Sequence, residues 1–214
     1  EPQVSAPSGL NFASKLHVEL NQPLPDAEGL GLKPDLCPQR QKGGRVEALK
    51  LLQSFMNGRG KNYQRQMSSP LSAHTACSRL SPHIAHGSLS LREIVQMSYH
   101  QSAQSKELPH RERSITKGSL HSFISRLHWH CHFIQKLESE PEVEFRSFHS
   151  AFDKARQTEP DDPLLLAFAE GQTGFPFIDA CMRSLHATGW INFRMRAMLV
   201  AFATYHLWQD WRHT

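Results

Sequence analysis

The sequence lacks the features of several common protein classes. Its longest apolar runs are short, such as Leu164–Ala169 and Ala197–Ala203, and none is long enough to span a bilayer. No positively charged and then apolar signal segment opens the chain. Its four cysteines lie far apart and form no CxxC pair, which argues against a zinc ribbon and a redox dithiol. We therefore expect buried, reduced thiols in a cytoplasmic, monomeric protein with no membrane contact.

Strand patterns are also scarce, and the periodicity that is present is helical, so the predicted fold class is all-α. Apolar residues recur at helical spacing from Val46 until Asn57-Gly58. Ser90 and Glu93 form a capping-box pattern that begins a second helix. Residues 101–118 are polar and basic and predict a loop, and Leu120–Leu137 predicts a long helix.

The C-terminal part predicts two further helices. Pro176 belongs in the first turn of a helix that runs to about Ala187, with Gly189 just past its end. Residues 191–211 contain neither glycine nor proline and should be helical for much of their length. Twelve phenylalanines and four tryptophans suggest a core rich in aromatic rings.

The N-terminal segment differs from the rest of the chain. Residues 1–45 contain nearly half of the 13 prolines and show little hydrophobic periodicity, so they predict a linker or surface arm. Residues 46–214 then form the helical domain. The formal net charge of +4 permits contact with phosphate backbones, although by itself it favours an ordinary, slightly basic protein.

The block Gly171–Arg196 contains a turn, a helix and a second turn before another helix. Asp179 and Arg183 are four residues apart and can pair on one helical face. Arg194 and Arg196 are two residues apart, so we expect them on different faces of the next helix. Periodicity alone would favour a helical hairpin with surface salt bridges.

The same block resembles the pattern G-x-T-G-x-P-x-x-D-A-x-M-R-x-L-x-x-T-G-W-x-x-x-R-x-R of the photolyase/cryptochrome flavoproteins. The resemblance covers about residues 45–214 and implies FAD as the cofactor. It also implies a truncated, multi-helix FAD-binding domain that is incomplete at its C-terminal end. A preceding α/β antenna domain is expected in the parent protein, and any antenna chromophore would be bound by that domain.

A second match is the segment Cys77–Ser90, which resembles the family pattern T-S-x-L-S-P-x-L-x-x-G-x-(I/L)-S. Small hydroxyl residues that enter a turn offer N–H groups and hydroxyls to phosphate. In the family this segment binds the FAD pyrophosphate, and Cys77 replaces the usual threonine. The cofactor-binding residues implied by the resemblance are Tyr63, Cys77, Ser78, Arg79, Leu80, Ser81, His130 and Arg196.

A third match, Leu127–Phe133, resembles L-x-W-R-(E/D)-F-(Y/F), with Trp129 lining the space between flavin and substrate and His130 replacing an arginine. A rival interpretation is a zinc site at His128 and His132, which share a helical face. Only two ligands come from that face and no carboxylate is obviously placed beside them, so ordinary helix histidines are favoured.

The resemblance weakens where the family contacts its DNA lesion. The usual pocket glutamate is Arg126 here, the usual asparagine is Phe193, and the methionine after the arginine pair is Ala197. Asn192 cannot simply replace that asparagine, because one residue turns a helical side chain by about 100°. These changes remove hydrogen-bond partners for pyrimidine edges and leave flavin binding untouched.

The resemblance implies two alternative functions. The first is light-driven splitting of pyrimidine dimers in damaged DNA, with Trp129 and Arg194 facing the lesion and Trp211 as the middle member of an electron-transfer chain of tryptophans. Tyr205 or Trp208 could replace an outer member of that chain. The second is a cryptochrome-like photoreceptor or another flavoprotein without repair activity, which the altered residues Arg126, Phe193 and Ala197 favour. A helical interaction domain that has lost FAD is a third.

Overall fold

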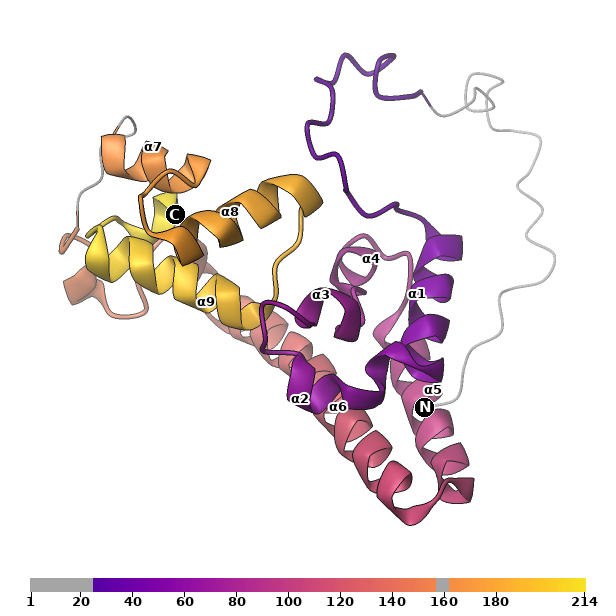
Figure 1. The fold of residues 1–214 in the computed structure, drawn as a ribbon. Helices are drawn as coiled ribbons and strands as arrows, with labels where there is room; N and C mark the ends of the chain where they lie inside the picture. The colour runs from indigo at the N-terminus through magenta and orange to yellow at the C-terminus, as the bar shows by residue number, and fades with distance from the viewer. Residues whose placement is uncertain (1–24, 157–161) are drawn as a thin grey trace, which may run out of the picture.

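Every regular element in the part of the chain that the computed structural model describes, residues 25–156 and 162–214, is a helix. This confirms the all-α fold class; residues 1–24 of the predicted arm lie outside the described residues. The 30-residue helix α6 (His110–Ser139) runs diagonally through the molecule. Helices α1 and α5 lie beside its first half, and α7, α8 and α9 lie toward its other end (Figure 1).

The N-terminal half packs around three aromatic rings. Phe55, Tyr63 and Phe123 are mutual neighbours, with ring centroids 4.6 to 5.8 Å apart. They come from α1, α2 and α6, so one aromatic cluster joins three helices. The helices of this half besides α6 are α1 (Arg45–Asn57), α2 (Tyr63–Gln66), α3 (Ala73–Ala76), α4 (Ser81–Ala85) and α5 (Leu91–Gln104).

The predicted loop at residues 101–118 is wrong. Helix α5 continues to Gln104, a 3₁₀ turn covers Ser105–Glu107, and α6 begins at His110, ten residues before the predicted start. The reason is that Arg, Lys, Glu and Gln are good helix formers, and polar residues are tolerated on every exposed face of a helix. The capping box at Ser90 and the end of α1 at Asn57 are confirmed.

The C-terminal half has its own core between α7 (Pro163–Glu170), α8 (Pro176–Thr188) and α9 (Phe193–Ala201). Pro176 is in the first turn of α8, and Gly189 follows the helix with φ 64°, so both helix signals are confirmed. After α9 the chain forms a π-helical turn, Phe202–His206, and a 3₁₀ turn, Trp211–His213. The expectation of helix over much of 191–211 is therefore confirmed.

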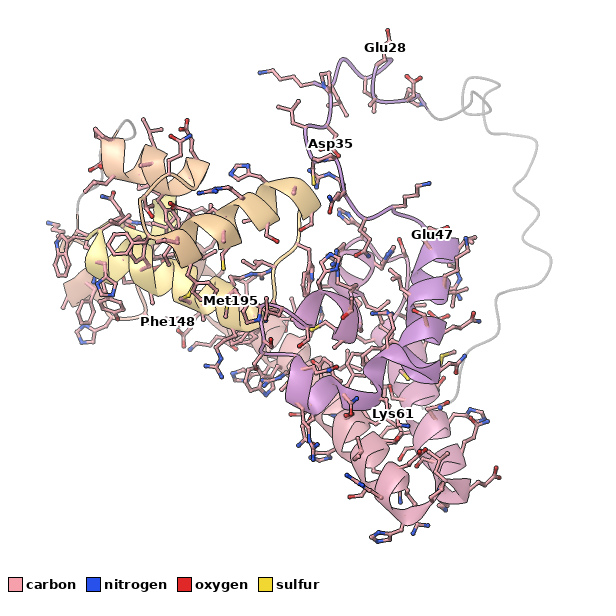
Figure 2. The ribbon with its side chains drawn as sticks, in the orientation of Figure 1. Glu28, Asp35, Glu47, Lys61, Phe148 and Met195 are labelled. Carbon is pink, nitrogen blue, oxygen red and sulfur yellow. The ribbon has the colours of Figure 1, made fainter. Side chains whose placement is uncertain are left out.

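The aromatic-core expectation holds only in part. Phe55 and Phe123 are buried, whereas Phe148 is 75% exposed and Trp208 is 58% exposed. Figure 2 shows Phe148 at the edge of the molecule and Met195 within the α9 packing. All four cysteines are free thiols; Cys181 is buried, Cys37 and Cys77 are partly buried, and Cys131 is exposed, so the expectation of buried thiols is wrong for Cys131.

Two observations bear on the rest of the sequence predictions. Residues 25–44 form no helix and run past the end of α8, where the Gln39 N–H donates to the Ala187 carbonyl at 2.9 Å. The role of residues 1–45 as a linker or surface arm, and the domain boundary at residue 46, stay predictions. Within the described residues, no helix is long and apolar enough to cross a membrane.

Glu93 provides a pH-dependent test of the N-terminal packing. Hydrogen bonds from Arg45 and from the Ser90 backbone lower the pKa of Glu93 to about 2. A lowered folded-state pKa stabilises the fold above the unfolded pKa, and this stabilisation is lost as pH falls through the folded value. We predict that Glu93→Gln lowers the free energy of unfolding by about 1–2 kcal/mol at pH 7. The difference should vanish near pH 2 in urea titrations followed by circular dichroism.

The exposed Glu107→Gln variant is the control, because it removes a carboxylate outside the capping box. Equal destabilisation by both variants, or an effect of Glu93→Gln that does not change with pH, would contradict the assignment.

Candidate functional site

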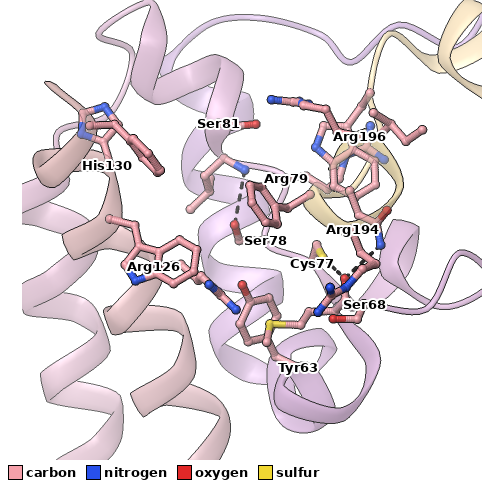
Figure 3. Close-up of a pocket in the computed structure, with 18 residues that line it drawn as sticks. Tyr63, Ser68, Cys77, Ser78, Arg79, Ser81, Arg126, His130, Arg194 and Arg196 are labelled. Carbon is pink, nitrogen blue, oxygen red and sulfur yellow. Dashed lines mark hydrogen bonds between the residues drawn. The ribbon is translucent and has the colours of Figure 1, made fainter. Parts of the chain in front are cut away.

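A cavity of about 540 Å³ lies between the two halves of the molecule, at the N-terminal end of α9 (Figure 3). Its volume is within the range of small-molecule sites. Residues from α2, the segment before α4, α6 and the start of α9 form its walls. All the predicted site residues except Trp211 line it, namely Tyr63, Cys77, Ser78, Arg79, Leu80, Ser81, Trp129, His130, Arg194 and Arg196.

Arg59 holds the segment 75–78 in place. Its guanidinium donates to the carbonyls of Thr75 at 2.8 Å, Cys77 at 2.7 Å and Ser78 at 3.3 Å. It also donates to the Leu51 carbonyl in α1 at 3.2 Å. Hydrogen bonds from a charged donor are stronger than neutral ones. One side chain therefore fixes backbone that lines the cavity, and no pattern in the sequence marked Arg59 for this role.

Arg79 has an unusual backbone and side-chain environment. Its φ of 64° is in the left-handed region, which is uncommon outside glycine and persists only where neighbours enforce it. The Gln41 amide donates to the Arg79 carbonyl at 2.8 Å, and the guanidinium lies 4.2 Å from the Trp190 ring centroid. The side chain is buried, yet its Nε has no hydrogen-bond partner in the described structure. A buried donor of this kind calls for a partner.

Two ionisable side chains, Tyr63 and Cys77, lie at this segment, and both are uncharged. Burial raises the pKa of the Tyr63 hydroxyl to about 12 and that of the Cys77 thiol to about 11. Both groups are therefore protonated at neutral pH and add no negative charge to the cavity. The Tyr63 hydroxyl remains available as a hydrogen-bond donor.

The first turn of α9 forms the opposite wall. Asn192 is the N-cap: its side-chain Oδ1 accepts from the Met195 N–H at 3.1 Å, and its side-chain amide donates to the Met67 carbonyl at 3.1 Å. This side chain is buried and caps α9, and the residue also lines the cavity. Arg194 and Arg196 both line the cavity. That they point to different faces of α9 stays a prediction, although both residues line the same cavity.

The α6 wall combines a cation with two rings. The Arg126 guanidinium lies 4.0 Å from the Trp129 ring centroid, and Phe193 meets Trp129 edge-on with centroids 6.1 Å apart. Trp129 is 42% exposed, so part of its surface stays open. Among the described residues, no group of three or more His, Cys, Asp or Glu side chains could hold a metal ion.

The charged side chains that line the cavity are all positive. Arg79, Arg126, Arg194 and Arg196 line it, and its lining contains no Asp or Glu. None of these four arginines forms an ion pair with a carboxylate in residues 25–156 or 162–214. In Figure 3 Arg126 enters from α6, and Arg194 and Arg196 enter from the α9 side. Such an arrangement favours a ligand that carries more than one negative charge.

The sequence did not predict some of the residues that line the cavity. Met67, Ser68 and Ile191 line the cavity, and Trp190 forms both its wall and the stack on Arg79. Trp190 could have been found, because it belongs to the T-G-W part of the resemblance. Ser68 has no such signal, since only the fold brings its loop to the cavity.

Asp179 has a different main role from the predicted one. It accepts hydrogen bonds from the Thr173 N–H at 2.8 Å, the Thr173 hydroxyl at 2.7 Å and the Gly174 N–H at 3.0 Å. These bonds, the Thr173 hydroxyl first, lower the pKa of Asp179. Its distance to the exposed Arg183 is 3.8 Å, so that ion pair is present but weak. The carboxylate chiefly closes the turn before α8.

Trp211 lies outside the cavity, in the C-terminal 3₁₀ turn, and is 38% exposed. In the segment that precedes it, the Arg156 guanidinium lies 4.4 Å from the Trp208 ring centroid and 5.3 Å from that of Tyr205. The electron-transfer roles of these rings stay predictions.

Comparison with known proteins points to one family. Residues 123–214 match the family described as the FAD binding domain of DNA photolyase. The chain is 31% identical to a deoxyribodipyrimidine photo-lyase of Streptomyces griseus, over 90% of this chain and 37% of that protein. A Synechocystis cryptochrome structure aligns with TM-score 0.71 and 25% identity, over 88% of this chain and 38% of that one. A class III photolyase structure from Agrobacterium tumefaciens aligns with TM-score 0.64 and 29% identity, over 79% of this chain and 32% of that one.

The chain belongs to the photolyase/cryptochrome family. It spans about two fifths of the length of the curated relatives it matches, 37% and 42% in two of them, so it corresponds to part of their helical FAD-binding domain. This confirms the family resemblance and the partial, truncated domain. Since both photolyases and cryptochromes are among the similar proteins, membership does not separate the two functions.

The Arg59 contacts give the first test of the site. Lysine cannot reproduce the fork of donors that serves four carbonyls, so partly buried acceptors would lose partners. We predict that Arg59→Lys lowers the free energy of unfolding by about 2–3 kcal/mol and speeds amide hydrogen exchange at residues 77–81. The exposed Arg65→Lys variant on α2 is the control. Unchanged exchange at 77–81 in the Arg59 variant would show that this side chain does not hold the segment.

Proposed function

We propose that this chain binds FAD in the Arg79–Arg196 cavity, defined by the lining residues given above. The observation that carries the proposal is the buried, unpartnered Arg79 Nε in a cavity with four arginines and no carboxylate. A pyrophosphate bears two negative charges and several acceptor oxygens, so it fits both features. The aromatic surfaces of Trp190 and Trp129 suit the two ring systems of a flavin dinucleotide.

The predicted cofactor-binding residues fall into groups according to the chemistry of their side chains. Ser78, Arg79 and Ser81, with the hydroxyl of Tyr63, would hold the phosphates through hydroxyl, guanidinium and backbone N–H donors. Leu80 and Cys77 would supply apolar surface beside them, and Cys77 offers a weak thiol donor in place of a hydroxyl. His130 and Arg196 would contact the cofactor from α6 and α9.

For the parent protein we propose light-driven repair of pyrimidine dimers in damaged DNA. Reduced FAD, when bound, would supply the light-driven one-electron chemistry that such repair needs. Trp129 would stack on an extruded base and Arg194 would contact the lesion strand. Trp211, with its oxidisable indole, would relay electrons within the protein. The names of the similar photo-lyases support this proposal.

A second candidate function is that of a cryptochrome-like photoreceptor or other flavoprotein without repair activity. Three residues favour it, because Arg126, Phe193 and Ala197 offer no amide or carboxylate to a pyrimidine edge. Losing a buried hydrogen-bond partner typically costs about 1–3 kcal/mol, so loss of two would weaken recognition of an ordinary dimer. The similarity to a Synechocystis cryptochrome is compatible with this alternative.

The FAD proposal is tested by titrating the flavin-free chain with FAD and following flavin fluorescence anisotropy. We predict saturable binding that Arg79→Gln weakens about tenfold or more, because a buried charge-assisted bond to phosphate is lost. The exposed Arg65→Gln variant should bind like the original chain. Circular dichroism checks that both variants are folded. No saturable binding to the original chain, or equal binding by all three proteins, would refute the site.

The choice between repair and sensing needs the parent protein. Light-dependent loss of dimers from single-stranded and duplex DNA is the measurement, with dark samples as controls. Repair in the light supports the photolyase proposal and rules out a sensor without repair activity. A flavin-loaded parent protein that leaves the dimers intact supports the second candidate.

A further inference from the structure

Two of the four cavity arginines are left without a role by FAD binding. The FAD pyrophosphate carries two charges, and Arg79 and Arg196 suffice to balance them. Arg126 and Arg194 then remain, and neither contacts a carboxylate within the described residues. Guanidinium groups that converge on a cavity without a counter-charge repel one another unless an anion is bound.

Arg126 differs from Arg194 in how it is held. It is half-buried and stacked on Trp129 at 4.0 Å, whereas Arg194 is exposed in the first turn of α9. A stacked guanidinium keeps its N–H donors at the ring edge, where they stay free to bind an oxyanion bidentately. Trp129 and Phe193 are 42% and 62% exposed, so both rings keep open surface for an aromatic base.

We infer that Arg126 determines what the α6 wall recognises: the phosphodiester beside an unpaired base of single-stranded nucleic acid, and not the base edge itself. The base stacks against Trp129 and Phe193, and Arg126 donates to the adjoining phosphate with Arg194 across the cavity. An arginine with two aromatic rings is the usual composition of a surface that binds unpaired nucleotides without reading their sequence. The inference rests on the proposed function only in taking nucleic acid as the ligand.

The test uses the whole chain and a fluorescein-labelled oligothymidylate of about ten nucleotides, a length within the usual site size. We expect Arg126→Gln to raise the dissociation constant about tenfold and to reduce the slope of log affinity against log salt by about one. Arg111 is an exposed arginine of the same helix that does not line the cavity, so Arg111→Gln is the matched control. It should change the dissociation constant and the salt slope less than Arg126→Gln does. Arg126→Lys keeps the charge but loses the planar fork and the stack on Trp129, so it should keep the salt slope of the original chain and recover only part of its affinity.

A chemical change in the ligand separates phosphate contact from base contact. Oligonucleotides that carry one neutral methylphosphonate linkage, placed at each position in turn, should include one that binds the original chain about tenfold more weakly. The same oligonucleotide should bind Arg126→Gln no more weakly than the unmodified one does, because the partner of that phosphate is already gone. Equal losses in both proteins, or equal effects of Arg126→Gln and Arg111→Gln, overturn the inference.

The flavin titration keeps this inference distinct from the proposed cofactor site. FAD affinity should change less than twofold in Arg126→Gln. A chain that binds FAD but not the oligonucleotide refutes the nucleic-acid inference alone. A chain that binds the oligonucleotide through Arg126 but not FAD refutes the cofactor site and leaves this inference standing.

Discussion

The Arg59 guanidinium, bonded to the carbonyls of Leu51, Thr75, Cys77 and Ser78, is the interaction on which the arrangement of the cavity depends. It joins α1 to the segment before α4 and so fixes the direction in which that segment leaves the first core. With the backbone fixed there, the next residue takes a left-handed conformation that Gln41 holds from the other side. The result is a buried Arg79 side chain that lines the cavity and whose Nε has no hydrogen-bond partner in the described structure.

The second constraint is electrostatic and follows from the first. Four arginines line a space without a carboxylate, and the two acidic hydroxyl and thiol groups beside them are kept neutral by burial. A fold that gathers so much positive charge at one point gains stability when an anion binds, since binding to the folded state alone shifts the folding equilibrium. The same charge therefore links the stability of the domain to its ligand. It also explains why the cavity can serve a dinucleotide on one wall and a phosphodiester on the other.

The sequence predicted the fold class and most of the cavity, and its failures have physical causes. The capping box at Ser90 and the glycine after α8 could be predicted from the sequence, because both depend only on residues close by in the chain. The start of α6 at His110 was missed, because a helix that is polar on all faces has no periodicity to detect. Ser68 and Arg59 could not be found, since their roles depend on contacts that the folded backbone creates. Arg194 and Arg196 were both predicted as site residues from the family pattern, whereas helical spacing alone did not indicate that one cavity contains both.

The most direct test of the account is a crystal structure of the chain with FAD bound. The account predicts that a pyrophosphate oxygen lies within hydrogen-bond distance of Arg79 Nε and of the 78–81 segment, with the Arg59 contacts unchanged. A cofactor bound elsewhere, or one bound in the cavity while Arg79 Nε still lacks a partner, would contradict it.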